Sequence, residues 1–174
     1  MKSKFNCILI TILILNILVS GYFIKENREL IEKIDKENLS AVNSLRGFLV
    51  SICNEIENIE DGKVDDVNLD ASYRYINSNF KNARLILNFK IPKKYSSTDY
   101  DFISSVLSLY EERFSDINSE ISKTELSIIK DDIRIIAYDF LPQFSDELIH
   151  PDNLKIVESY WQNEVMVRLE YLEN

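Results

Sequence analysis

Glu147 and His150 are the strongest lead to a metal site in this sequence. The spacing Glu-x-x-His places a carboxylate and an imidazole on one helical face, as in the di-iron sites of helical bundles. Such a site needs two copies of the motif and two further glutamates, but His150 is the only histidine in the chain. His150 also directly precedes Pro151, where helical geometry is disfavoured. We therefore predict no metal ligand here and interpret His150 as a residue at the start of the last helix.

The acidic segment ENIEDGKVDDVN around Gly62 invites comparison with a calcium-binding loop. With Gly62 at the sixth loop position, Ile59 and Asn68 fall where the ion needs an oxygen ligand and a bidentate glutamate. The match fails. A solvated turn between two helices, with Asp65 or Asp66 capping the second helix, explains the same residues.

The sequence also gives little support for nucleophilic or acid–base catalysis. Cys53 has no histidine in its own helix, and neither a Gly-x-Ser-x-Gly motif nor a glycine-rich phosphate loop is present. The acidic neighbours Glu111–Glu112 and Asp131–Asp132 are adjacent in sequence, so they point to different sides of a helix and are interpreted as solvated. The sequence predicts a protein that is not an enzyme, with no catalytic residue, no cofactor and no metal.

The two cysteines do not predict a disulfide within the chain. Cys7 lies inside an apolar run and Cys53 lies in the following domain, so the two thiols cannot meet. We interpret Cys53 as a small buried apolar residue beside Ile52 and Ile56. The alternative is a disulfide to a second chain.

One segment, FKIPKKYSSTDYDF over residues 89–102, combines cationic and aromatic side chains in a predicted loop. Such residues on a loop can anchor a partner protein. The predicted contact residues are Lys90, Lys93, Lys94, Tyr95 and Tyr100. Under the alternative interpretation, Phe89 and Phe102 belong to the core and the lysines are simply solvated.

The elements that would carry these residues are helices. Apolar residues spaced by three and four predict five helical segments, over residues 42–59, 69–87, 103–121, 126–140 and 154–172. Gly62, Pro92, Pro142 and Pro151 fall between the segments, where helices end. No segment alternates with a period of two. The predicted fold is all-α, an antiparallel up-and-down helical bundle of four or five helices joined by short connections.

The number of helices depends on the region between the third and fourth segments. Ser122 is followed three residues later by Glu125, the pattern of a capping box at a helix N-terminus. This pattern predicts a break. Since neither Gly nor Pro occurs there, one long bent helix is the alternative.

Residues 5–24 carry no charge and are mostly Ile and Leu. Twenty helical residues span roughly 30 Å, the thickness of the hydrocarbon core of a bilayer. We predict a transmembrane signal-anchor helix over 5–24, after a short basic tail over 1–4. The alternative is a secretory signal cleaved after a small-residue site at 19–21. Because a basic head precedes the apolar run, the N-terminus is expected inside and the following domain outside.

The remaining domain boundaries follow from the helical register. Ile31 and Ile34 fall out of the register of the first bundle segment, which predicts a helical stalk over 25–40 that bends or unwinds. The bundle domain is predicted over 41–174.

The composition narrows the class of partner. The formal net charge of −9 and the pI near 4.7 argue against nucleic-acid binding, which depends on a basic surface. The expected partners are membrane lipid, through residues 5–24, and a protein or a second copy of the chain. The predicted function is protein–protein contact or scaffolding by a membrane-anchored bundle at the outer side of the cytoplasmic membrane. The alternatives are an extracytoplasmic bundle that senses a small ligand, or a secreted helical protein.

Overall fold

The computed structural model describes the backbone of residues 2–90, 101–115, 121–144 and 154–172. It describes the side chains of residues 13–88, 101–115, 121–143 and 155–172. Every regular element in these ranges is a helix, and no strand occurs among them. The predicted all-α fold is confirmed.

The chain divides into two compact units, residues 1–37 and 38–174. The division falls three residues before the predicted start of the bundle domain at 41. Helix α1 (Lys2–Glu60) includes all of residues 25–40, so the unwinding predicted there is wrong. Ion pairs one turn apart, Lys25 with Glu29 and Lys33 with Glu37, support the helix in this region, which contains neither Gly nor Pro.

The predicted transmembrane helix over residues 5–24 is not supported by the structure. Among the helices whose side chains are described, none is both long enough and apolar enough to cross a membrane. Residues 5–12 of the predicted span lie outside the described side chains.

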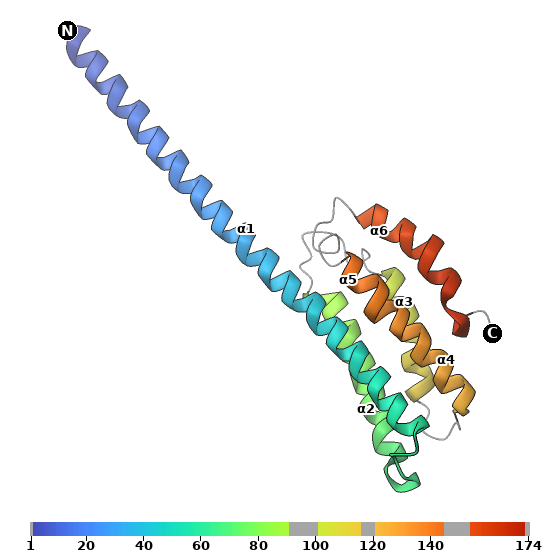
Figure 1. Ribbon diagram of the computed structural model, residues 1–174. Helices are drawn as coiled ribbons and strands as arrows, with labels where there is room; N and C mark the ends of the chain where they lie inside the picture. Colours follow the sequence, from blue (N-terminus) through green and yellow to red (C-terminus); the bar gives the residue numbers. More distant parts are fainter. Residues whose placement is uncertain (1, 91–100, 116–120, 145–153, 173–174) are drawn as a thin grey trace. The chain divides into compact units, whose positions relative to one another are not determined.

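Five helical stretches form the described part of the second unit (Figure 1). The first is the part of α1 from residue 38 onward. Helix α2 (Asp66–Leu85) continues into a π-helical turn, η1 (Ile86–Lys90), and α3 spans Asp101–Ser115. Helix α4 (Lys123–Arg134) continues through the π-helical segment η2 (Ile135–Phe140) into α5 (Leu141–Phe144). Helix α6 (Leu154–Tyr160) continues through η4 (Trp161–Val165) and η5 (Met166–Arg168), and η6 (Glu170–Leu172) follows.

Contacts between α1 and the α4–η2 stretch fix their relative direction. Arg46 Nε donates to the Ala137 carbonyl at 3.1 Å, near the start of the bundle part of α1. At the other end of α1, Glu60 forms an ion pair with Lys130. Residue numbers therefore rise along one helix as they fall along the other, so the two helices are antiparallel.

The same argument orders the helices in between. The rings of Phe80 and Tyr110 lie 6.1 Å apart, and those of Tyr73 and Phe114 lie 5.8 Å apart, so α2 and α3 are antiparallel. Tyr110 also contacts Asp132, on α4. Arg113 of α3 also pairs with Glu125 of α4, so these two helices are antiparallel as well. Because Ser72 of α2 contacts Glu55 of α1, the four helices form a closed ring.

Helix α6 adds a fifth stretch to the ring through an aromatic cluster. The Trp161 ring meets Phe140 edge-on at 4.9 Å and Phe102 at 5.5 Å between centroids. Edge-to-face packing of this kind is favourable beyond the apolar area that it buries. Trp161 is completely buried and attaches the last helix to both α3 and η2.

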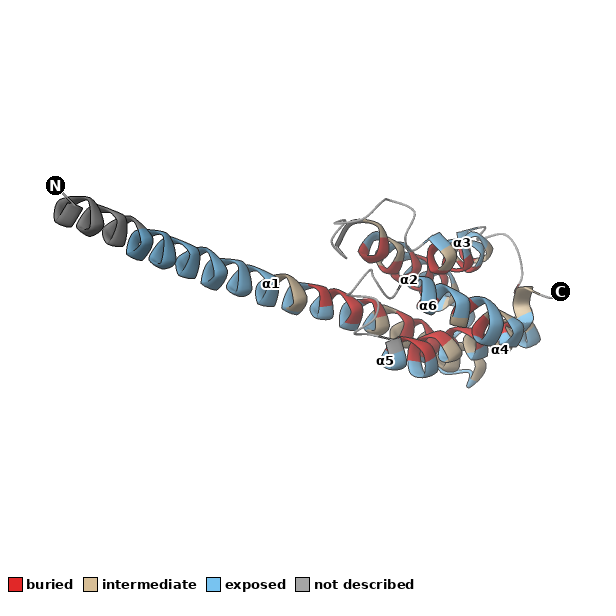
Figure 2. Cartoon of the chain, turned by 90° about the horizontal axis from the view of Figure 1, so that it is seen from above, coloured by how far each residue is buried: buried red, intermediate tan, exposed pale blue. Residues whose placement is uncertain are grey.

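The core lies where the apolar spacing predicts it, on the inward faces of the bundle helices (Figure 2). The apolar residues spaced by three and four along each of the five predicted segments form a stripe on that helix. Where their side chains are described, these residues are buried, apart from Ile59, Leu69 and Leu172, which are half-buried. Ile117 and Leu154 of those stripes lie outside the described side chains. Full burial of a Leu or Ile side chain stabilises a fold by about 1.5–3 kcal/mol, so these stripes supply most of the stability.

The turn after α1 has the geometry of a Schellman motif. Gly62 adopts φ +69°, its N–H donates to the Ile59 carbonyl at 3.1 Å, and the Lys63 N–H donates to the Asn58 carbonyl at 2.9 Å. Glycine is favoured there because a left-handed backbone crowds Cβ. Asp65 then caps α2 by accepting from the Asn68 N–H at 3.0 Å. The prediction of a helix–helix turn capped by Asp65 or Asp66 is confirmed, with Asp65 as the cap.

The predicted break between the third and fourth segments is also confirmed. Ser122 is extended, at φ −67° and ψ 153°, and its hydroxyl accepts from the Glu125 N–H at 3.2 Å. Helix α3 ends at Ser115 and α4 begins at Lys123, so one long bent helix is excluded.

Pro142 does not separate two helices as the sequence predicts. It is the second residue of α5, inside a continuous helical stretch. The π-helical segment before it explains this, because the Leu141 N–H donates five residues back, to the Ile136 carbonyl. The bonding pattern has therefore already shifted away from i→i−4 where the missing N–H of proline arrives. Pro92 and Pro151 lie outside the described residues.

Candidate functional site

The predicted contact surface lies outside the described side chains. Lys90 is the last residue of η1, with no described side chain. Lys93, Lys94, Tyr95 and Tyr100 all fall within 91–100, outside the described residues. The surface therefore stays a prediction.

The residues that the sequence suggested for metal binding or catalysis form no active centre among the described side chains. Glu147 and His150 lie outside the described residues. Among the side chains that are described, no three His, Cys, Asp or Glu residues come close enough together to hold a metal ion.

Asp132 is not solvated, and this part of the carboxylate prediction is wrong. It is only 1% exposed, and its carboxylate accepts three hydrogen bonds. The Tyr110 hydroxyl donates at 2.8 Å, the Glu170 N–H at 2.9 Å and the Tyr171 N–H at 3.0 Å. These donors offset part of the cost of burying the carboxylate. The neighbouring Asp131 is exposed as predicted.

The electrostatics of this cluster point to a structural role. Burial raises the pKa of Asp132 from its ordinary value, while its three hydrogen bonds oppose that rise. Burial, and then the nearby Asp132 carboxylate, raise the pKa of Tyr110 far above the neutral range. The two N–H donors belong to the C-terminal turn η6, and the Tyr171 ring lies 5.3 Å from the Tyr110 ring. Asp132 therefore fastens the C-terminal turn to α3 and α4.

Glu125 takes part in a second link between the same elements. Arg113 on α3 forms an ion pair with it, with Arg113 Nη2 to Glu125 Oε2 at 3.0 Å. Hydrogen bonding from Arg113 is the largest cause that lowers the pKa of Glu125, with smaller contributions from the Ser122 N–H and the Tyr171 hydroxyl. One carboxylate thus joins a helix cap, a neighbouring helix and the C-terminal turn.

Glu111 is a second exception to the predicted solvated carboxylates. Its Oε2 lies 2.6 Å from Arg84 Nη1, and its side chain is only 14% exposed. This pair links α2 to α3. Glu112, its neighbour, is exposed as predicted.

Cys53 is buried, as the sequence predicts, with 2% of its surface exposed. Its Sγ lies 3.7 Å from the Lys130 carbonyl of α4. Burial raises the pKa of Cys53 to about 12, so the thiolate needed for nucleophilic chemistry is disfavoured at neutral pH.

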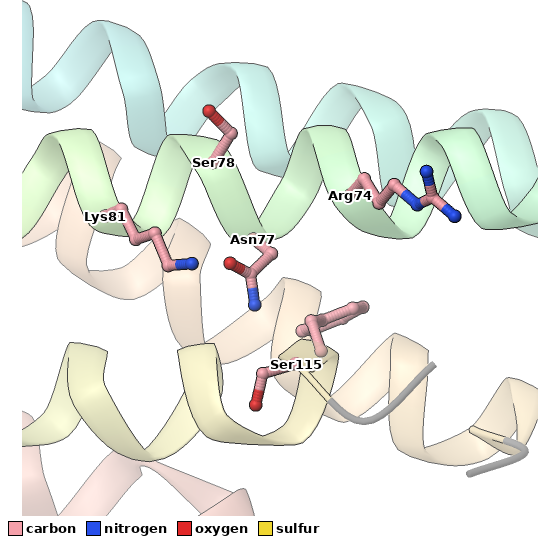
Figure 3. Close-up of a pocket in the computed structure, with 6 residues that line it drawn as sticks. Arg74, Asn77, Ser78, Lys81 and Ser115 are labelled. Atoms are coloured by element: carbon pink, nitrogen blue, oxygen red, sulfur yellow. The ribbon is translucent and has the colours of Figure 1, made fainter. Parts of the chain in front are cut away.

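A pocket of about 340 Å³ lies between α2 and α3. Its lining combines two cations with amide, hydroxyl and aromatic groups, from Arg74, Asn77, Ser78, Lys81, Phe114 and Ser115. Figure 3 shows Arg74 and Lys81 on α2 on either side of Asn77, whose side chain points towards Ser115. Sequence reasoning missed this site. The available signal was the spacing of Arg74, Asn77, Ser78 and Lys81, which places four polar residues on one helical face.

The most apolar surface of the described residues lies on α1 within the first unit. Its large side chains are between 46% and 66% exposed, at Leu13, Ile14, Leu15, Ile17, Leu18, Val19, Tyr22, Phe23 and Ile24. Exposed contiguous apolar surface of this kind marks a contact with a protein, a ligand or a membrane.

No protein-family model, curated protein or solved structure matches this chain.

Proposed function

We propose that the chain is a non-enzymatic helical-bundle protein that acts by contact with a partner protein or a second copy, held at the outer side of the cytoplasmic membrane. The observation that carries the proposal is the exposed apolar surface of residues 13–24. These side chains point to all sides of the helix, and a helix that is apolar all round is normally covered by lipid or by a protein core. The uncharged sequence of 5–24 favours lipid.

The bundle itself supports a contact role more than a catalytic one. Three of its described buried polar residues, Ser72, Asn77 and above all Asp132, join helices to one another. Its one buried thiol among the described residues has a pKa raised to about 12. These groups stabilise a rigid body, which is what a scaffold or docking domain requires.

Cell fractionation tests the membrane part of the proposal. A full chain with a C-terminal tag should remain in the membrane fraction after an alkaline carbonate wash and be digested when spheroplasts are treated with protease. Tag recovered in the soluble exported fraction, on a chain that begins near Tyr22, would make residues 5–24 a cleaved signal. Tag that stays membrane-bound but protected would place the bundle inside, and either result overturns the proposed location.

Charged substitutions separate lipid contact from other causes of sedimentation. Leu15→Arg with Leu18→Arg should release the chain from the membrane, because an arginine near the centre of a span costs roughly 2.5–3.5 kcal/mol. The matched control is Leu85→Arg with Ile156→Arg, which adds the same charge at exposed apolar positions of the bundle. Equal release by both pairs would argue against lipid contact through residues 13–24.

Site-specific crosslinking tests the contact role. A photo-reactive amino acid at Tyr95 or Tyr100 should yield a discrete crosslinked species in intact cells. The same group at Tyr75, an exposed tyrosine of α2, serves as the control. A chain that stays monomeric and uncrosslinked from all three positions would contradict protein contact through the predicted surface.

A further inference from the structure

The pocket between α2 and α3 is large enough for a small molecule. Its volume of about 340 Å³ lies at the lower end of the range typical of small-molecule sites, roughly 300–1,000 Å³. Phe114, which is 2% exposed, provides a rigid apolar wall. Its ring lies 5.8 Å from Tyr73 and 5.9 Å from Phe80, so the core holds it in place.

The charge of the pocket is opposite to that of the chain. The chain carries a net charge of −9, yet the described residues that line the pocket include two cations and no acidic side chain. Other cations of the bundle, such as Arg84, Arg113 and Lys130, form ion pairs between helices. Neither Arg74 nor Lys81 forms an ion pair with any side chain that the structure describes.

The polar groups between the cations are positioned by the helices. Asn77 is 8% exposed, and its Nδ2 donates to the Glu111 carbonyl at 3.3 Å, which leaves the second amide hydrogen free to donate. The Ser115 hydroxyl already donates to the Glu112 carbonyl at 2.7 Å, so its oxygen is left to accept. A ligand that carries both an anionic group and a hydroxyl would satisfy the two residues.

The distance between Arg74 and Lys81 along α2 restricts which ligands can contact both residues. Arg74 and Lys81 are seven residues apart, which corresponds to about 10.5 Å along the helix axis. In Figure 3 the Arg74 guanidinium and the Lys81 amine lie on either side of Asn77, so a single oxyanion placed beside one of them is not beside the other. We propose that this pocket binds a small organic molecule that carries at least two anionic groups, with one carboxylate or phosphate held by Arg74 at one end and another by Lys81 at the other. The proposal is independent of the membrane anchor.

Nuclear magnetic resonance titration of the ¹⁵N-labelled full chain, in uncharged detergent at constant ionic strength, tests this proposal. The two probes are citrate and fructose 1,6-bisphosphate, which distinguish carboxylate from phosphate as the bound group. We expect saturable shifts of the amide signals of Arg74, Asn77, Lys81 and Ser115 with at least one probe. Acetate, with one carboxylate, should bind at least ten-fold more weakly than citrate.

A matched pair of variants makes the result decisive. Arg74→Gln with Lys81→Gln should weaken binding of the preferred probe at least ten-fold. Arg28→Gln with Lys155→Gln removes the same charges from exposed positions elsewhere and should leave binding unchanged. Equal weakening in both double variants, shifts centred on other residues, or no saturable shift with either probe would overturn the proposal. A spectrum of R74Q/K81Q with unchanged dispersion shows that the variant remains folded.

Discussion

The Tyr110 hydroxyl donates to the Asp132 carboxylate at 2.8 Å inside the bundle, and so joins α3 to α4. The same carboxylate accepts the N–H groups of Glu170 and Tyr171. A single buried acidic residue therefore ties together two helices and the C-terminal turn, which explains how a short 3₁₀ segment is kept against the bundle.

Removing either partner of this hydrogen bond should destabilise the bundle. Asp132→Asn places an amide where the carboxylate accepted from several donors, so at least one buried N–H loses its acceptor. We expect the free energy of unfolding at neutral pH to fall by about 2 kcal/mol for Asp132→Asn and by about 1–2 kcal/mol for Tyr110→Phe. Urea unfolding followed by circular dichroism measures both.

The neighbouring acidic residue is the control for this experiment. Asp131 lies next to Asp132 but is exposed, and among the described side chains it pairs with Arg134, at 3.6 Å on the same helix. Asp131→Asn should change the free energy of unfolding by less than about 0.5 kcal/mol, as is usual at the surface. Equal effects at the two positions would show that Asp132 is not the fastening point inferred from its contacts.

Glu125 should make the stability of the bundle depend on acid pH. Its pKa is lowered from the ordinary value of 4.5, chiefly by hydrogen bonding from Arg113. A lowered folded-state pKa means that its contribution is fully present above 4.5 and is lost as the pH falls through the folded value. The difference in unfolding free energy between the wild type and Glu125→Gln should therefore be largest near neutral pH and shrink below about pH 4.5.

Urea unfolding at a series of pH values checks this expectation. Glu112→Gln is the control. Because Glu112 is exposed, this variant should differ little from the wild type in unfolding free energy at every pH. Glutamine at 125 can still take part in a capping box, so the cap is retained while the ionic contact is lost. A difference between wild type and Glu125→Gln that is constant from pH 3 to pH 7 would contradict the role assigned to the Arg113 contact.

Two glycines of α1 and the turn after it should respond to alanine with opposite signs. Gly62 has φ +69°, where an L side chain is strained, so Gly62→Ala should lower the free energy of unfolding by about 1–2 kcal/mol. Gly47 lies inside α1, so Gly47→Ala should raise it by up to about 1 kcal/mol through helix propensity. An added Cβ meets nothing within 4 Å at either site, so steric clash does not confuse the comparison.

Thermal unfolding of the two variants gives the answer directly, since the substitution is chemically the same in both. No loss of stability in Gly62→Ala would mean that the helix end at Glu60 is placed wrongly, and a loss in Gly47→Ala would contradict an unstrained helical position at Gly47.

The apolar pattern predicted the helices because burial of one face outweighs weaker local preferences. Val42, Leu45 and Leu49, for example, all lie in the core as their spacing indicates. The two helix caps could also be predicted, because the side chains of Ser122 and Asp65 each accept a hydrogen bond from the N–H three positions further along the chain. Both are short-range effects, so the sequence alone contains them.

What the sequence did not reveal depends on contacts between distant residues. From the sequence alone, Asp132 cannot be told apart from an exposed acidic residue. Its role depends on the fold, in which the hydroxyl of Tyr110, 22 positions away, and the N–H of Glu170 donate to it. The π-helical segments, such as Ile135–Phe140, have no comparable local signature. The basic pocket was missed for a similar reason, because Ser115 and Phe114 join Arg74 and Lys81 only through the packing of α3 on α2.

Cys53 should be protected from thiol reagents by the bundle. Its side chain is 2% exposed and its pKa is raised to about 12, so both access and thiolate formation are disfavoured. In a Cys7→Ser background, reaction with a disulfide reagent such as Ellman's at pH 8 should be at least a hundred-fold slower in the folded protein than in urea. The control is Cys7→Ser with Cys53→Ser and Ser44→Cys, which places the only thiol at an exposed position of α1. This control should react rapidly in both states. A folded Cys53 that reacts as fast as the control would show that the α1–α4 contact at Lys130 opens readily, and would bring back the disulfide to a second chain as an explanation for this residue.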